Sequence, residues 1–248
     1  MSGAADNNQI LQIENVSAGY GKATILNDVD LSIGRGEFFG LIGLNGAGKT
    51  TLIKTILGLR SPQQGAIKIF GEPNTAIAGK KHMAYLPERF DPPWFLSGFE
   101  FVKFSLRMYK QPYDEKAVIQ AAETLALDKN ALGRRVHSYS KGMRQKLGLL
   151  GTVLTGCDFL ILDEPMSGLD PLARTLVKDM LLETKKKEHT IFLSSHILAD
   201  LDEICDRIAV LHDGAIRYVG TPKDLKAKTS SKNLERSFLE YIEKREYA

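Results

Sequence analysis

Gly43-Leu44-Asn45-Gly46-Ala47-Gly48-Lys49-Thr50, followed by Thr51, is the most informative segment of this chain. It fits a known pattern, a glycine, four residues and then Gly-Lys-Thr, whose backbone wraps a phosphate. Residues 38–42 before it form an apolar run that predicts a buried strand. Residues 51–57 after it predict a helix that ends at Gly58. Strand, glycine loop and helix follow in the order that a phosphate loop requires.

The residue types of this segment suit a nucleotide phosphate. Its glycines let the backbone come close to a ligand and adopt φ angles that other residues avoid. The backbone N–H groups can then surround a phosphate at the N-terminus of the helix, where the dipole favours an anion. Lys49 would reach the β- and γ-phosphates, and the Thr50 hydroxyl would bind Mg²⁺. The candidate ATP-binding residues of the loop are Gly43, Asn45, Gly46, Ala47, Gly48, Lys49, Thr50 and Thr51.

The composition is that of an ordinary globular protein. Of the 248 residues 43% are hydrophobic and 25% charged, enough for one large α/β domain or two small lobes. A net charge of +3 gives no reason to propose nucleic acid as a partner. Cys157 and Cys205 lie far apart without metal-ligand spacing, which predicts buried, reduced thiols in a cytosolic protein.

Neither a signal peptide nor a membrane span is visible. Residues 1–9 are small and polar, and we predict a disordered tail there. The chain has no run of about 18 apolar residues, so we expect that it does not cross a membrane by itself.

The apolar patterns predict strands near both ends of the chain and helices in the middle. Residues 10–36 alternate apolar and polar residues, which is typical of strands with one buried face. Residues 97–156 are mostly helical in pattern and suggest a second lobe inserted into an α/β core. Asp213-Gly214 between two apolar runs predicts a β-hairpin. From Leu234 the tail predicts an amphipathic helix, which we expect to pack on the body, with binding to a partner as the alternative.

A continuous apolar strand predicted over residues 159–164 ends in two carboxylates. Asp163, beside a phosphate loop, can hold Mg²⁺ through water, and Glu164 can orient an attacking water. A strand that simply ends in solvated acids is the alternative. His196 follows another predicted strand, residues 190–194, at the same sheet edge, which favours a functional role.

Two further features have structural interpretations. Asp170-Pro171 predicts a helix start with Asp170 as the N-cap, and the lysine cluster at residues 185–187 is interpreted as the solvated end of that helix. Tyr20 lies in a glycine loop between the first strands, and two interpretations are equally open. It can be exposed and stack on a purine ring, or it can be a half-buried anchor.

In their order along the chain these motifs resemble those of the ATP-binding-cassette (ABC) ATPases, the nucleotide-binding subunits of ABC transporters. The resemblance covers about residues 10–228. Gly43–Thr51 resembles the Walker A loop, and Phe159–Glu164 resembles the Walker B motif, with Glu164 at the position of the catalytic glutamate. Tyr139-Ser140-Lys141-Gly142-Met143-Arg144-Gln145 is similar to the family signature loop, which other phosphate-loop NTPases lack.

Three further positions extend the resemblance. Ser167-Gly168-Leu169-Asp170 is similar to the D-loop, His196 lies where the family has its switch histidine, and Tyr20 where it has an adenine-stacking aromatic residue. The resemblance therefore implies catalytic roles for Glu164, His196 and Lys49. It also adds Tyr20, Ser140, Gly142 and Asp170 to the candidate ATP-binding residues.

Two positions depart from the family pattern. The usual signature is Leu-Ser-Gly-Gly-Gln, whereas Lys141 replaces the first glycine here and would add a charge near the phosphates. After the predicted strand of residues 83–86 the family usually has glutamine, whereas Glu88 here can accept but not donate when ionised. Both departures look like those of exporter-type ABC ATPases whose membrane subunit is a separate chain. The candidate metal ligands are Thr50, Asp163 and Glu88.

The resemblance implies an α/β fold. It predicts a P-loop NTPase core of the ABC ATPase type, with an N-terminal antiparallel β subdomain and a helical subdomain inserted at about residues 90–156. The ABC ATPase domain would cover residues 10–228, and residues 229–248 would contain the C-terminal amphipathic helix.

The resemblance also implies partners. Two subunits would form a head-to-tail dimer, with a homodimer expected, around two Mg-ATP. Lys49 and Thr50 of one subunit would face Ser140 and Gly142 of the other. An integral membrane permease subunit would hold the chain at the cytoplasmic face of the membrane, with no nucleic acid involved. Hydrolysis of ATP would then drive the export of a substrate.

Other interpretations stay open at this point. The aromatic stretch of residues 90–109 is either core for the helical lobe or a groove that receives a short helix of a membrane subunit. A soluble ABC ATPase that acts as an ATP-gated clamp in assembly or repair is the alternative function. A nucleotide-sensing scaffold is a third reading, should Glu88 and Lys141 impair hydrolysis.

Overall fold

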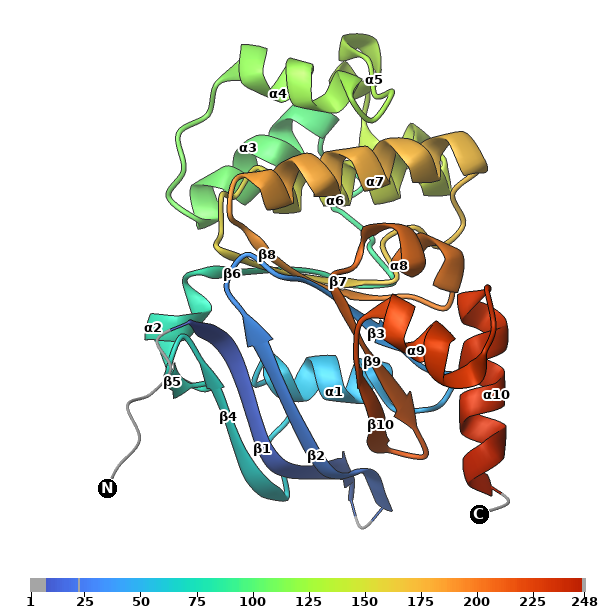
Figure 1. Cartoon of the computed structure of the whole chain (residues 1–248). Coiled ribbons are helices and arrows are strands. Elements are labelled where there is room, and N and C mark those ends of the chain that lie inside the picture. The colour runs from blue at the N-terminus through green and yellow to red at the C-terminus, as the bar shows by residue number, and fades with distance from the viewer. Residues whose placement is uncertain (1–7, 22, 247–248) are drawn as a thin grey trace. The chain divides into compact units, whose positions relative to one another are not determined.

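A computed structural model describes residues 8–21 and 23–246 of the chain, in two compact units (Figure 1). One unit contains the residues up to His82 together with those from Thr190 onward, and the other contains Met83–His189. Most of the disordered tail predicted for residues 1–9 lies outside the described residues. Its predicted boundary is slightly too late, because Gln9 already begins the first strand.

An antiparallel sheet lies in the first unit, as the family resemblance implies, and its strands have the one buried face that the alternating pattern predicts. Val29, Leu31 and Ile33 are buried on one face of a strand, whereas Asp30 between them is exposed. This period of two fits a sheet that covers the core with one face only. In spatial order the strands are β2 (Ala23–Gly34), β1 (Gln9–Tyr20), β4 (Gln64–Ile69) and β5 (Glu72–Pro73).

A largely parallel set of strands in the same unit carries the phosphate loop. Its central strand is apolar and all five of its residues are buried, which is typical of a strand covered on both faces. That strand is parallel to both neighbours, and the outer strand closes the hairpin predicted at Asp213-Gly214. The order within this unit is β8 (Thr190–Ser194), β3 (Phe38–Ile42), β9 (Arg207–His212) and β10 (Ala215–Gly220).

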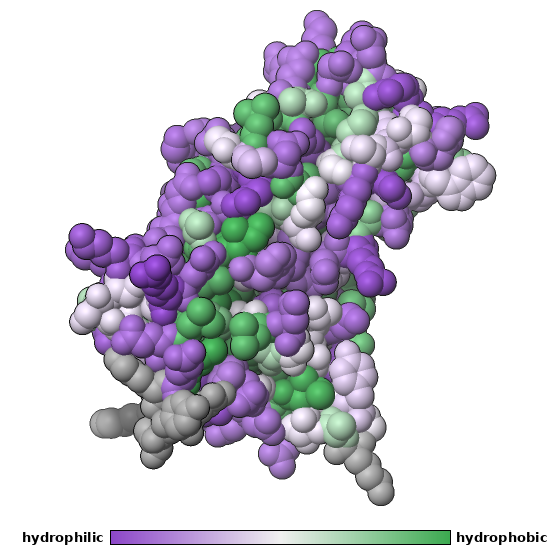
Figure 2. Space-filling view, turned by 90° about the vertical axis from the view of Figure 1, so that its right-hand side faces the viewer, coloured by the Kyte–Doolittle hydropathy of each residue, from purple (hydrophilic) through white to green (hydrophobic). Residues whose placement is uncertain are grey.

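The helices of the first unit include the predicted amphipathic tail. Leu234, Phe238 and Ile242, four residues apart, are each at most 6% exposed, and the Tyr241 and Tyr218 rings meet with centroids 5.7 Å apart. Figure 2 views the side on which this tail helix lies and shows hydrophilic residues around small hydrophobic areas. Other residues of this chain therefore bury the apolar face of the tail helix. The helices are α1 (Lys49–Ile56), α2 (Ile77–Lys80), α8 (Leu198–Ile204), α9 (Pro222–Thr229) and α10 (Leu234–Glu246).

The second unit combines two parallel strands with helices. Its strands pair with Leu86 opposite Leu162, and its first helix begins at a capping box formed by Ser97 and Glu100. The helical pattern predicted over residues 97–156 is present as separate helices joined by turns. The elements are β6 (Met83–Leu86), α3 (Gly98–Met108), α4 (Glu115–Glu123), α5 (Lys129–Gly133), α6 (Lys141–Val153), β7 (Phe159–Asp163) and α7 (Pro171–Lys186).

The two cysteines differ in their exposure. Cys157 is buried, as predicted, but Cys205 is partly exposed, so the prediction of two buried thiols is wrong for Cys205. The reason is local, because Cys205 caps the C-terminal end of α8, where the chain turns toward β9. Its sulfur still packs closely on the sheet, 2.9 Å from where a Cβ on Gly40 would lie. Within residues 8–21 and 23–246, no helix is long and apolar enough to traverse a bilayer.

Candidate nucleotide site

The phosphate loop joins β3 to α1 in the first unit, and two of its glycines leave no room for a side chain. A Cβ on Gly43 would lie 2.7 Å from the carbonyl oxygen of Leu211. Gly48, the N-cap of α1, has φ 108°, and a Cβ there would lie 2.9 Å from Cδ2 of Leu26. Glycine tolerates both the close packing and the positive φ. The loop therefore ends at the N-terminus of a helix, where the dipole favours an anion.

Lys49 folds over this loop. Its ammonium donates to the carbonyl oxygens of Gly43 at 2.7 Å and of Leu44 at 3.4 Å, and the residue is only 8% exposed. A buried ammonium is costly unless polar or charged partners surround it. The geometry thus fixes a positive charge beside the N–H groups of the loop, a combination that suits the oxygens of a polyphosphate.

Tyr20 ends β1 close to the start of α1. A hydrogen bond with the side chain of Thr51 is the largest cause that lowers the pKa of the Tyr20 phenol. The ring is 48% exposed, and the guanidinium carbon of Arg60 lies 3.7 Å from its centroid. The side chain thus combines features of both sequence interpretations, since its hydroxyl is anchored while about half of its surface is open to solvent.

His196 lies at the edge of the sheet that carries the phosphate loop. β3 and β8 are parallel neighbours with Leu41 opposite Ser194. The loop follows β3 and His196 follows β8, so both come from the carboxyl ends of adjacent strands. His196 is exposed, and the Oγ of the preceding Ser195 accepts the N–H of Ile197 at 3.0 Å.

The two predicted carboxylates lie at the end of β7 in the second unit, where Asp163 is the last residue of the strand and Glu164 follows it, and both are buried. Asp163 is 1% exposed and Glu164 is 6% exposed. Glu164 has φ 52°, and its carbonyl oxygen accepts the N–H of Ser167 at 3.0 Å. Left-handed backbone is uncommon outside glycine and is often found at functional sites. Burial argues against the alternative of a strand that ends in solvated acids.

Glu88 follows β6 at the same edge of the second unit, because β6 and β7 are parallel and in register there. Tyr85 of β6 is a residue of this edge that the sequence analysis missed. Burial first, and then the charges of Asp163 and Glu88, raise the pKa of Tyr85 to about 12. Tyr85 is therefore a protonated phenol beside carboxylates at neutral pH. Its only sequence signal is a hydroxyl within an otherwise apolar strand.

The chemistry of the candidate metal ligands fits Mg²⁺. Thr50, Asp163 and Glu88 offer only oxygen atoms, which this hard cation prefers. The part of the chain that the structure describes contains no group of three or more His, Cys, Asp or Glu side chains that could hold a metal ion by itself. Mg²⁺ commonly needs only one or two carboxylates when nucleotide phosphates and waters complete its coordination. The donor set is thus suited to a cation that arrives with a nucleotide.

The signature-like loop starts α6 in the second unit. Ser140 is the N-cap of this helix, and its hydroxyl accepts the N–H of Met143 at 3.2 Å. A Cβ on Gly142 would lie 3.4 Å from Cδ2 of Leu169, and Lys141 lies against Gly168. The structure therefore places the signature-like loop next to the segment that resembles the D-loop.

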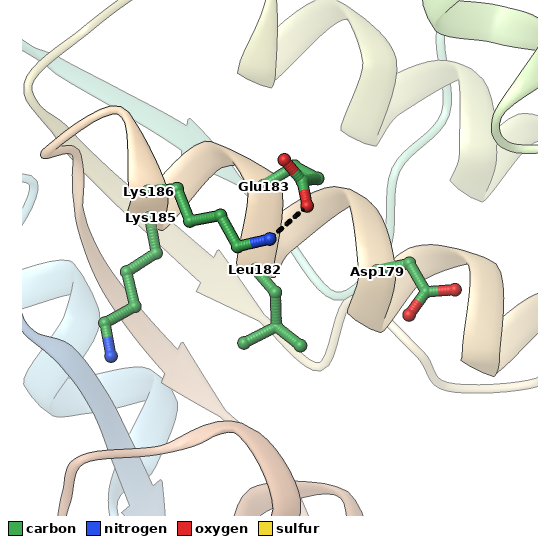
Figure 3. A pocket seen from close by; sticks show the side chains of 5 residues that line it. All are labelled: Asp179, Leu182, Glu183, Lys185 and Lys186. Atoms are coloured by element: carbon green, nitrogen blue, oxygen red, sulfur yellow. Dashed lines mark hydrogen bonds and ion pairs between the residues drawn. The ribbon is translucent and has the colours of Figure 1, made fainter.

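Asp170, another predicted site residue, caps α7. Its carboxylate accepts the N–H of Ala173 at 2.8 Å, as the Asp-Pro pattern predicts. At the other end of α7 a surface pocket is lined by four charged side chains and by Leu182 (Figure 3). There the ammonium of Lys186 lies 2.5 Å from the Glu183 carboxylate, and both side chains are well exposed. The lysine cluster is thus a solvated helix end, as interpreted from the sequence.

The aromatic stretch of residues 90–109 divides into two groups. Phe90 and Phe101 meet edge to face, 5.4 Å between centroids, and Phe101 is buried. Four other large apolar side chains are more than half exposed, and such a concentration is unusual for a surface helix and its approach loop. The exposed residues are Trp94, Phe95, Phe104 and Met108. Some residues of the stretch therefore belong to the core of the second unit, and the others form an apolar surface.

Comparisons with known proteins agree with these motifs. A family model described as "ABC transporter" matches residues 26–167. An uncharacterised ABC transporter ATP-binding protein of Synechocystis is 37% identical over 203 residues, 81% of this chain and 57% of the relative. The bacitracin transport ATP-binding protein BcrA of Enterococcus faecalis is 34% identical over 83% of this chain and 67% of BcrA.

Solved structures resemble the whole fold. A structure described as the ATP-binding subunit of an ABC transporter has a TM-score of 0.83 and 32% identity, covering 94% of this chain and 99% of that one. The dimeric MJ0796 cassette, at 20% identity and a TM-score of 0.77, shares the fold. The chain spans less than two thirds of the Synechocystis relative. The fold is thus the predicted P-loop NTPase fold of the ABC ATPase type, and the chain belongs to the ABC transporter ATP-binding protein family.

Proposed function

We propose that the chain binds and hydrolyses Mg-ATP as the ATP-binding subunit of an ABC transporter. The observation that carries this proposal is the pair of buried carboxylates at the end of β7, Asp163 and Glu164, in a chain that also has a phosphate loop with a buried Lys49. A phosphate loop alone supports binding, whereas hydrolysis needs a group that activates water.

Each residue has a role that follows from its chemistry. Lys49 and the loop N–H groups bind the β- and γ-phosphates, and Tyr20 stacks on the base. Glu164 accepts a proton from the attacking water, and His196 donates to the γ-phosphate. Thr50, Asp163 and Glu88 would hold Mg²⁺, which when bound offsets the charge of the phosphate oxygens. Lys49 and the loop then stabilise the negative charge of the transferred phosphoryl group.

A head-to-tail dimer completes the site. In the second unit the hydroxyl of Ser140 and the backbone of Gly142 lie at the exposed N-terminus of α6, which suits the γ-phosphate of an ATP held by another subunit. ATP would join two subunits, and hydrolysis would let them separate. Such a two-state element, with different ligand affinity in each state, is what coupling to transport requires.

The transporter role rests on the exposed apolar residues of the second unit. Trp94 and Phe95 precede α3, and Phe104 and Met108 lie one turn apart on it. We propose that they receive a short helix of a separate membrane permease, which holds the chain at the cytoplasmic face of the membrane. Relatives named for fluoroquinolone export and for Nod factor export favour export as the direction.

The test is Glu164→Gln in the purified chain. This variant should bind ATP, hydrolyse it at least about 100-fold more slowly than wild type, and accumulate as a dimer with ATP in size-exclusion chromatography. Glu183→Gln, an exposed glutamate on α7, is the matched control and should keep wild-type turnover. Near-normal turnover of Glu164→Gln would refute the assigned base. Recovery of only soluble proteins with tagged Glu164→Gln, in mild detergent with ATP, would refute the transporter role.

A further inference from the structure

Arg60 and Tyr20 form a stacked pair beside the phosphate loop. The guanidinium carbon of Arg60 lies 3.7 Å from the centroid of the Tyr20 ring, the closest such pair in the described part of the chain. The Nη1 of Arg60 also donates to the carbonyl oxygen of Gly19, the residue before Tyr20. Its Nε is buried and makes no hydrogen bond with any described residue. Stacking on the ring is therefore a main contact of this guanidinium.

Backbone structure fixes both members of the pair. α1 ends at Ile56, Gly58 shortly after it has φ 67°, and the N–H groups of Leu59 and Arg60 both donate to the carbonyl oxygen of Lys54. This closure turns Arg60 back toward β1. On the other side, a Cβ on Gly19 would lie 1.9 Å from a carbonyl oxygen of β2, so only glycine allows the tight hairpin that presents Tyr20.

The pair leaves one face of the ring for a ligand. Arg60 covers one face of Tyr20, yet the residue is still 48% exposed. A planar guanidinium stacks on an aromatic face by cation–π attraction, and lysine does not reproduce this geometry. A ring held in place by such a contact loses less conformational freedom when a base stacks on it, which strengthens binding.

We propose that Arg60 is a positioning residue for nucleotide binding, which backs one face of the Tyr20 ring so that the base of the nucleotide stacks on the other face. This inference rests on the proposed ATP-binding function and deepens it. The hydrogen bond between Tyr20 and Thr51 ties the same ring to the residue after Thr50. The phosphate loop thus lies at the N-terminus of α1, and the support for the base lies in the turn that follows its C-terminus.

The test separates base recognition from phosphate recognition. Affinities of the purified chain for Mg-ATP and for Mg-tripolyphosphate, which lacks a base, are measured by titration calorimetry. Arg60→Met should weaken ATP binding about two- to fivefold and leave tripolyphosphate binding unchanged. Arg60→Lys should resemble Arg60→Met, because the charge without the planar stack is insufficient. Arg35→Met is the matched control, since Arg35 lies over Phe70 at 5.2 Å and should not affect either ligand.

A double-mutant cycle shows whether Arg60 acts through Tyr20. Tyr20→Leu should weaken ATP binding about tenfold, and adding Arg60→Met to Tyr20→Leu should cause no further loss. Three outcomes would each overturn the inference while ATP binding stands. Arg60→Met could weaken tripolyphosphate binding as much as ATP binding, or it could keep its full effect on ATP binding in the Tyr20→Leu background. It could also have no effect on ATP binding at all. A wild-type chain that binds neither ligand would overturn the proposed function as well.

Discussion

The side chain of Lys141 lies over Gly168, so that a Cβ on Gly168 would be 3.0 Å from the Lys141 ammonium. Gly168 also has φ 74°, a conformation that other residues rarely adopt. Lys141, which departs from the family signature, is therefore matched by the absence of a side chain at Gly168. The lysine that replaces the first signature glycine is accommodated by a glycine in the segment that resembles the D-loop.

Gly168→Ala should destabilise the protein by about 1–2 kcal/mol, because a residue with a Cβ is strained in the left-handed backbone at this position and the new Cβ displaces Lys141. The free energy of unfolding from urea denaturation measures this change. Gly133→Ala at the end of α5 is the control, since its φ is not positive and no atom lies within 4 Å of the new Cβ. Equal stability of the two variants would contradict the strained geometry at Gly168.

Mixing two inactive variants should restore ATP hydrolysis if the site lies between subunits. Lys49→Met removes the phosphate ligand, and Ser140→Asp keeps the N-cap of α6 but places a carboxylate against the γ-phosphate. Random assortment leaves about a quarter of the sites with Lys49 from one subunit and Ser140 from the other. Turnover of the mixture should therefore rise well above that of either variant alone. A mixture as inactive as its components would indicate that both residues act within one subunit.

Tyr85 should make the stability of the protein sensitive to alkaline pH. Its pKa is raised from 10.0 to about 12 in the folded state, first by burial and then by Asp163 and Glu88. Above the unfolded pKa of 10.0 the folded state binds more protons than the unfolded state, so stability falls as the pH rises toward about 12. Tyr85→Phe should lose less stability than wild type between pH 9 and 11, as measured by urea denaturation with the same protocol. Parallel pH profiles of the two proteins would rule out this role for Tyr85.

The parts of the fold that sequence predicts are those that depend on neighbours along the chain. The phosphate loop, the Asp213-Gly214 hairpin and the N-cap at Asp170 each follow from residues within one turn or loop. The burial of Phe38–Ile42 follows from an apolar run that is too short for a helix to be favoured. Local chemistry fixes these elements, so a single sequence is sufficient.

Features that depend on tertiary packing could not be predicted in the same way. Arg60 stacks on a tyrosine 40 residues earlier, and the pKa of Tyr85 is raised first by burial and then by Asp163 on a neighbouring strand. The partial exposure of Cys205 depends on how α8 ends, and the burial of Phe101 beside an exposed Trp94 depends on which side chains pack against each of them. No local pattern encodes these contacts, because they arise only when separate elements pack together.

The exposed aromatic residues give the sharpest test of the membrane partner. Trp94→Glu combined with Phe95→Glu places charges on an apolar surface where large aromatic side chains would be expected to dominate binding energy. In the native host, the fraction of the chain that sediments with membranes should fall about tenfold, while ATP hydrolysis by the purified variant stays at the wild-type level. Ile77→Glu in the first unit, where the isoleucine is 82% exposed, is the control and should sediment normally. Unchanged sedimentation of the double variant would mean that this surface does not dock a permease, and the soluble clamp function would then account better for the chain.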